Sequence, residues 1–211
     1  MTTVGNLTTG TTARGQTNGT HSSTHGYCCG GGEPTELDVI DKWPFASDTN
    51  ATDVGNLTQS RRSGAATCSS DYGYMAGGSS FPPNHNIIDK WAFATDGNAT
   101  DVGDLTMTHG NNTHGAQSTT YGYSCGGNPQ SDVIEKWSYA TDGNATDVGN
   151  ILDTVRYPST ASSTTHGYRC GGYISLGYND RIDKWSFTTD GNATDVANLL
   201  GGSSQHVGNQ Y

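Results

Sequence analysis

The 211-residue sequence has few of the side chains that normally build a protein core. Leu, Ile, Val and Phe together account for 28 of the 211 residues. A share below about 20% is typical of disordered chains when the net charge is also high. Here only 14% of residues are charged, and the net charge is −10. The charge condition for disorder is therefore not met. The low share of apolar residues nevertheless favours disorder, and the chain is rich in Gly, Thr, Ser and Asn instead.

Other absences exclude whole classes of protein. The sequence has no run of about 18 apolar residues that would span a membrane. It has no block of basic residues and its pI is near 4.8, so a nucleic-acid partner is disfavoured. Residues 1–6 have neither a basic start nor an apolar stretch, so no secretory signal is expected. A helix bundle would need far more Leu, Ala, Glu and Lys.

Three phrases recur four times in the same order, with a period near 48 residues. A Trp follows Asp-Lys or Glu-Lys each time, at Trp43, Trp91, Trp137 and Trp185. A Gly-Tyr pair is followed by two residues and a double glycine, with the tyrosines at Tyr27, Tyr74, Tyr123 and Tyr168. The third phrase, Asp-x-Asn-Ala-Thr-Asp-Val, begins at Asp48, Asp96, Asp142 and Asp190. The order and spacing predict four repeats of one structural unit.

Each repeat is predicted to form four short strands. Alternation over residues 39–45 places Asp41, Trp43 and Phe45 on one strand face. Asp-Gly in the next phrase is a strong hairpin signal, and Asn-Ala-Thr-Asp-Val would be the returning strand. Small-residue segments such as 64–68 and Gly-Tyr segments such as 72–76 supply the other two strands. Four strands per repeat at this period is typical of a β-propeller.

The repeat resembles the kelch type, mainly through the double glycines that follow the Tyr. These are Gly30 and Gly31, Gly77 and Gly78, Gly126 and Gly127, and Gly171 and Gly172. An Arg or His precedes each first strand, at Arg14, Arg61 or Arg62, His109 and Arg156, and again at His206. The chain departs from the kelch pattern because its Trp lies on the third strand instead of the fourth. The resemblance implies one all-β propeller domain over 1–211, with four kelch-like blades of four antiparallel strands. The blades are expected near 4–53, 54–101, 102–147 and 148–195, with 196–211 as a closing or exchanged strand.

The wording Thr-Asp-Gly-Asn-Ala-Thr-Asp-Val-Gly-Asn is also similar to kelch-like repeats in virion proteins of marine bacteriophages. This resemblance implies a structural component of a virion surface or appendage, present in many copies among other assembly proteins. It places the chain on an extracellular particle surface. We expect residues 203–211, which resemble a fifth first strand, to seal the ring, lie on the surface or pair with a neighbouring chain.

No arrangement of residues points to catalysis, a metal or a cofactor. Cys29, Cys125 and Cys170 occupy one repeat position, where the second repeat has Ala76, so they are expected to be small buried residues. The loop 142–147 has oxygen ligands at alternate positions, as calcium loops do, but it lacks the downstream Glu of such loops, so a structural turn is favoured. The acids beside the Trp are expected to accept hydrogen bonds from the repeat Arg, and the Trp and Tyr rings to pack between blades.

The segments after each double glycine differ between repeats, and variable insertions often form a binding face. They supply flat rings and polar donors, so we expect a partner or ligand site there. The candidate residues are Phe81, Asn84, His85, Tyr173, Tyr178 and Asn179. The sequence therefore predicts a non-enzymatic display or docking module. The alternatives are a host-glycan receptor-binding module that uses these loops and, more weakly, a carbohydrate-active propeller enzyme.

Overall fold

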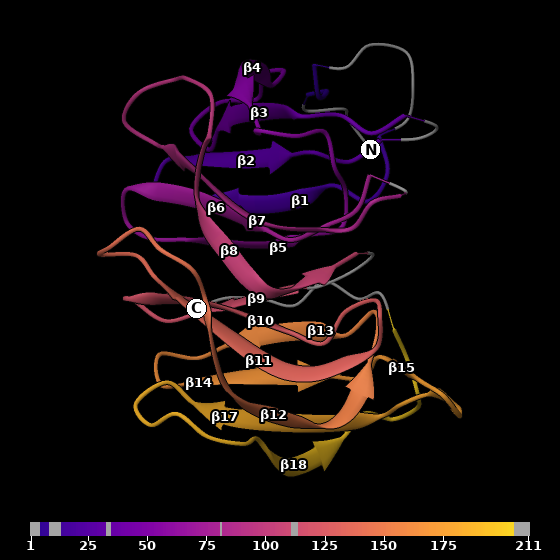
Figure 1. Ribbon diagram of the computed structural model, residues 1–211. Coiled ribbons are helices and arrows are strands. Elements are labelled where there is room, and N and C mark those ends of the chain that lie inside the picture. The colour runs from indigo at the N-terminus through magenta and orange to yellow at the C-terminus, as the bar shows by residue number, and fades with distance from the viewer. Residues whose placement is uncertain (1–4, 9–13, 33–34, 81, 111–113, 205–211) are drawn as a thin grey trace.

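A computed structural model describes residues 5–8, 14–32, 35–80, 82–110 and 114–204, and these residues form an all-β protein. Figure 1 shows short strands gathered into sheets that follow one another from the indigo N-terminal part to the orange and yellow C-terminal part. Within the described residues no helix could cross a bilayer. The expectation of an all-β chain is confirmed, and the disorder suggested by composition is wrong for the described residues.

The strands form four antiparallel sheets of four strands each. Sheet 1 contains β1 (Asn18–His21), β2 (His25–Cys29), β3 (Val39–Pro44) and β4 (Thr52–Asn56). Sheet 2 contains β5 (Ala65–Cys68), β6 (Tyr72–Ala76), β7 (His85–Ala92) and β8 (Thr100–His109). Sheet 3 contains β9 (His114–Gln117), β10 (Tyr121–Cys125), β11 (Ser131–Ser138) and β12 (Thr146–Val155). Sheet 4 contains β13 (Ser159–Ser162), β14 (His166–Cys170), β17 (Arg181–Ser186) and β18 (Thr194–Asn198).

Each sheet thus corresponds to one sequence repeat, with its strands hydrogen-bonded in chain order. The fourth repeat has an additional hairpin of β15 (Tyr173–Ile174) and β16 (Gly177–Tyr178), which forms a separate two-stranded sheet. The expected boundaries at 53/54, 101/102, 147/148 and 195/196 fall inside the fourth strands β4, β8, β12 and β18, because the polypeptide leaves each sheet only after its fourth strand. The Asp-Gly pairs do lie between the third and fourth strands. The connection is a seven-residue loop (93–99 in sheet 2) and not the tight turn that Asp-Gly suggested.

Consecutive sheets pack side by side through their first strands, β1 against β5, β5 against β9 and β9 against β13. No closed ring is formed by the described residues. Sheets 1 and 4 lie at opposite extremes of the array, with β4 at one end and β18 at the other (Figure 1). Ser203 is described, but residues 205–211, including His206, lie outside the described part. As far as the structure describes the chain, the array is therefore open between sheets 1 and 4.

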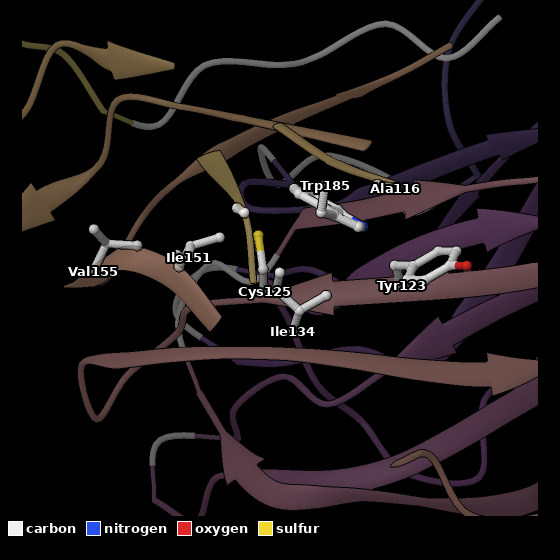
Figure 2. Packing of buried hydrophobic residues seen from close by; sticks show 8 residues of the cluster. Ala116, Tyr123, Cys125, Ile134, Ile151, Val155 and Trp185 are labelled. Carbon is white, nitrogen blue, oxygen red and sulfur yellow. The ribbon is translucent and has the colours of Figure 1, made fainter. Parts of the chain in front are cut away.

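The core is divided among the spaces between successive sheets. One cluster joins Tyr123, Cys125 and Ile134 of sheet 3 to Trp185 of sheet 4. Figure 2 shows the Trp185 ring reaching the side chains of sheet 3, with Tyr123 and Cys125 nearby. Two further clusters join sheets 1 and 2, and sheets 2 and 3, in the same manner. A few large rings per junction take the place of the missing aliphatic residues, because each aromatic side chain buries a large area.

The Gly of each Gly-Tyr pair is required by the Trp directly opposite it on the next strand. Gly122 is paired with Trp137, and a Cβ on Gly122 would lie 2.3 Å from the indole ring. The same cross-strand pair and close approach recur in the other three sheets.

The double glycine after the second strand is explained by its backbone conformation. Gly77 and Gly78 have φ of 64° and 103°, which residues with a Cβ rarely adopt. Together they turn the chain out of the second strand.

Candidate functional site

The surfaces between sheets repeat one aromatic contact. The Tyr on the second strand of one sheet stacks on an aromatic ring of the next sheet: Tyr27 on Phe93, Tyr74 on Tyr139 and Tyr123 on Phe187, with centroids 4.8, 4.8 and 4.7 Å apart. All three tyrosines are buried. The fourth member of the series, Tyr168, is only half-buried, because no further sheet packs against it within the described ranges. The expectation that Trp and Tyr pack between sheets is confirmed at these three junctions.

A buried acid on each third strand fixes the segment that joins two sheets. Asp89 accepts hydrogen bonds from the amide and the hydroxyl of Thr58, at 3.0 and 2.7 Å. Arg61 Nη1 lies 2.9 Å from Asp89 Oδ2, and both side chains are fully buried. Thr58 and Arg61 both belong to the connection between β4 and β5. The acid therefore holds this connection against sheet 2, as the sequence predicted for the repeat Arg and Asp.

The same arrangement occurs in sheets 1 and 3 with small changes. In sheet 1, Arg14 and Thr8 bond to Asp41. In sheet 3, His109 Nε2 lies 3.1 Å from Glu135 Oε2, and Thr106 donates to the same carboxylate. Each acid is buried, and each has a basic partner from the chain just before its own sheet, Arg14 ahead of β1 and His109 at the end of β8. A repeated buried pair of this kind gives the array one fixed way of joining its sheets.

Sheet 4 departs from the expectation that Arg156 serves as its repeat Arg. The position equivalent to Arg61 is occupied by Val155, and the guanidinium comes from Arg169 on β14, which pairs with Asp183. Arg156 instead lies over the Tyr173 ring, 4.6 Å from its centroid. The sequence pattern did not reveal this exchange, because Arg169 follows the Gly-Tyr phrase at a position that varies between repeats.

A row of ion pairs crosses the junctions near the Asp-Gly loops. Lys42 pairs with Asp96, Lys90 with Asp142 and Lys136 with Asp190, at N–O distances of 2.5, 2.7 and 2.7 Å. The Lys belongs to one sheet and the Asp to the loop of the next. Asp142, which the calcium alternative used as a ligand, is therefore engaged by a lysine. The part of the chain that the structure describes holds no cluster of three or more His, Cys, Asp or Glu suited to a metal.

The segments after the double glycines lie along one end of the sheets and contact one another. Asn84 Nδ2 donates to the carbonyl of Asn128 at 2.9 Å, and Gln130 Nε2 donates to the carbonyl of Tyr173 at 3.1 Å. Glu36 lies 3.6 Å from Arg62 at the other end of this row. The variable segments therefore form one continuous ridge, as expected for a shared face. Phe81 lies outside the described residues.

His85 belongs to the ridge but is not arranged as a catalytic base. Its Nε2 lies 2.5 Å from Ser80 Oγ, and that hydroxyl also lies 2.8 Å from the carbonyl of Ser60. A carbonyl only accepts, so the single hydroxyl proton of Ser80 goes to Ser60 and His85 donates its own N–H to Ser80. Burial lowers the pKa of His85. The pair therefore holds the loop and does not activate Ser80 as a nucleophile.

The remaining candidate residues, Tyr173, Tyr178 and Asn179, lie in or next to the β15–β16 hairpin. Tyr173 and Tyr178 form an edge-to-face pair with centroids 5.5 Å apart, and Tyr178 is 66% exposed. Leu176 at the tip of the hairpin is 92% exposed. Asn179 instead accepts a hydrogen bond from Arg169 and donates one to Asp153. The hairpin thus offers an apolar surface, whereas the side chain of Asn179 is occupied by hydrogen bonds to Arg169 and Asp153.

The opposite end of the sheets carries a depression that the sequence reasoning missed. The turns between the first and second strands of all four sheets line it, and its volume is about 620 Å³. Each turn supplies two adjacent hydroxyl residues: Ser22 and Ser23, Ser69 and Ser70, Ser118 and Thr119, Ser163 and Thr164. The first Ser of each turn accepts backbone N–H bonds, as Ser69 does from Tyr72 at 3.1 Å. The pair of adjacent hydroxyl residues that recurs in each repeat is the sequence feature from which this depression could have been predicted.

The cysteines show which sheet surfaces are covered. All five thiols are free. Cys29 and Cys125 are fully buried, and burial raises the pKa of Cys125 to about 12. Cys170 occupies the same repeat position in sheet 4 but is only half-buried. The expectation that this position takes a small buried residue therefore holds where a following sheet covers it.

A scan against protein-family models finds no match for this chain. No curated protein matches it either.

Proposed function

We propose that the chain is a non-enzymatic docking and display module built as an open arc of four kelch-like, propeller-type blades. The observation that supports this proposal most is the repeated joining of the sheets, with stacked rings at three successive junctions and a buried, paired acid in each sheet. A series joined in this way presents equivalent turns of every sheet on the same surfaces, as the shared depression illustrates. A firm surface to which each repeat contributes suits the attachment of other proteins.

The setting that we propose for this module is the surface or an appendage of a phage virion, where it is present in many copies beside other assembly proteins. The support is the resemblance of the repeat wording to marine phage virion proteins. The test is mass spectrometry of purified particles of the virus that encodes the chain. Peptides of the chain at a stoichiometry of several copies per particle are expected, and their absence from intact particles would contradict the proposal.

A second candidate function, recognition of a host-surface glycan, rests on the β15–β16 hairpin. Tyr178 and Leu176 are exposed there, and Tyr173 is held by Arg156. Flat rings in this setting suit the apolar faces of sugars. The test is a glycan array with the wild type, Tyr178→Ala and a control, Phe45→Ala. Phe45 is also exposed, at 57%, but lies on sheet 1. Binding that Tyr178→Ala loses and Phe45→Ala keeps is expected. No binding by the wild type, or equal loss in both variants, would reject this function.

A further inference from the structure

The two ends of the array carry opposite halves of the junction that joins the sheets internally. Sheet 4 presents the half formed by a second-strand Tyr and a third-strand Lys, here Tyr168 and Lys184. Sheet 1 presents the other half, with Phe45 exposed and Asp48 in the adjoining loop. Among the described residues, no ion pair involves Lys184 or Asp48. Rings and charges at the two ends are therefore complementary.

A second copy of the chain is the partner that fits both halves. Its Phe45 would meet Tyr168 as Phe93 meets Tyr27, and its Asp48 would meet Lys184 as Asp96 meets Lys42. Such contacts are head to tail, and they generate either a ring or an open filament. Two features of the chain nevertheless stand in the way of this association.

The first obstacle is the N-terminal segment 5–8, which occupies the place of a preceding fourth strand on sheet 1. The amide of Asn6 donates to Asn50 Oδ1 at 3.0 Å, as Asn56 donates to Asn98 at 3.1 Å. The amide of Ala51 donates to the carbonyl of Asn6 at 2.9 Å. Gly5 lies so close to Thr49 that a Cβ would be 2.3 Å from its carbonyl oxygen. The fourth strand of another copy cannot occupy the same place.

The second obstacle is Ala197 on β18. The equivalent residues of the other three sheets are Gly55, Gly103 and Gly149. A Cβ on each would lie 2.2–2.4 Å from a backbone carbonyl oxygen of the next sheet. Backbone at that distance must shift as a whole, because no side chain is available to turn aside. The methyl group of Ala197 therefore blocks the approach that glycine permits in every internal junction.

We propose that the end faces of sheets 1 and 4 form a matched interface for a second copy of this chain, and that segment 5–8 and Ala197 keep this interface closed. A repeat face that no other repeat covers can continue to associate. Here the seated segment 5–8 on sheet 1 and the methyl group of Ala197 on sheet 4 oppose that association, while the attractive rings and charges remain in place.

The test combines Gly5→Val, which forces segment 5–8 from Thr49, with Ala197→Gly. Sedimentation velocity over a hundredfold range of concentration is expected to show monomers for the wild type and for each single variant. The double variant is expected to form dimers or longer species. Adding Asp48→Lys to the double variant should return it to monomers, because the charge would then face Lys184. The matched control pairs Ala197→Gly with Gly201→Val, since a Cβ on Gly201 meets nothing within 4 Å.

Asn6→Pro with Ala197→Gly provides a second way to release segment 5–8, by removing the amide that bonds to Asn50. If Gly5→Val prevents folding, the double variant Asn6→Pro with Ala197→Gly tests the proposal in its place. Folded double variants that remain monomeric would overturn the proposal. Association of the wild type that Asp48→Lys abolishes would overturn it as well, because the interface would then be open without any release.

Discussion

Replacing Asp89 by Ala is expected to lower the free energy of unfolding by about 3–5 kcal/mol, the usual cost of removing one partner of a buried ion pair. The loss leaves Arg61 charged, fully buried and without its carboxylate. The amide and hydroxyl of Thr58 lose their acceptor at the same time. Because these groups belong to the connection between sheets 1 and 2, the variant should separate the two sheets and not merely loosen one strand. Urea denaturation followed by circular dichroism measures the change.

The matched control is Asp96→Ala, which also removes a carboxylate from an ion pair between sheets 1 and 2. The Asp96 side chain is 57% exposed, and its partner Lys42 remains partly solvated. Exposed pairs of this kind contribute about 0–1 kcal/mol. A similar loss in both variants would mean that burial of the Asp89 pair does not determine the stability of the junction.

Trp137→Ala is expected to cost about 3–5 kcal/mol, as removal of a large buried ring does in other cores. Trp137 is buried between sheets 2 and 3, in contact with a cluster that contains Tyr74 and Ile88. Its removal leaves a cavity over Gly122, which has no side chain to fill the space. Denaturation with urea, followed by circular dichroism, gives the difference from the wild type.

Trp43→Ala is the comparison that shows how much of the lost stability comes from packing of the ring against a neighbouring sheet. Trp43 has the same cross-strand partner, Gly26, and the same position on its third strand, but it is only half-buried. Its removal should therefore cost less than half as much as removal of Trp137. Equal losses for the two variants would show that the ring acts within its own sheet, and the account of sheet-to-sheet packing would then be wrong.

Repetition allowed the sequence to predict most of the fold. The recurrence of Trp91, Tyr74 and Gly77 with their counterparts fixed the number of units, and alternation of side chains identified the third strand. Composition misled because it counts aliphatic residues, whereas this core uses Trp and Tyr rings over glycines. The kelch resemblance implied a four-bladed propeller but left open whether its ring closes within one chain, because the residues of a single repeat do not show how strongly successive sheets turn about a common axis.

The candidate site was only partly predictable. Tyr173 and Tyr178 were chosen as variable aromatic residues, and the structure brings them together at a hairpin. His85 and Asn179 were chosen by the same criterion but hold the loops in place. Sequence variability does not distinguish a residue that faces solvent from one that supports a loop. Arg169 was missed for the opposite reason, because one sheet obtains its buried cation from a different strand.

The central claim is that each sheet covers the preceding one while no sheet of the described residues covers sheet 4, and the thiols test it directly. Cys29 and Cys125 lie beneath a following sheet, whereas the equivalent Cys170 is half-buried. Mass spectrometry after labelling of the native protein with a maleimide at pH 8 is the measurement. Modification of Cys170 alone is predicted, at a rate independent of protein concentration, with Cys125 reacting only after unfolding. Protection of Cys170 equal to that of Cys125 would contradict the account, because sheet 4 would then be covered.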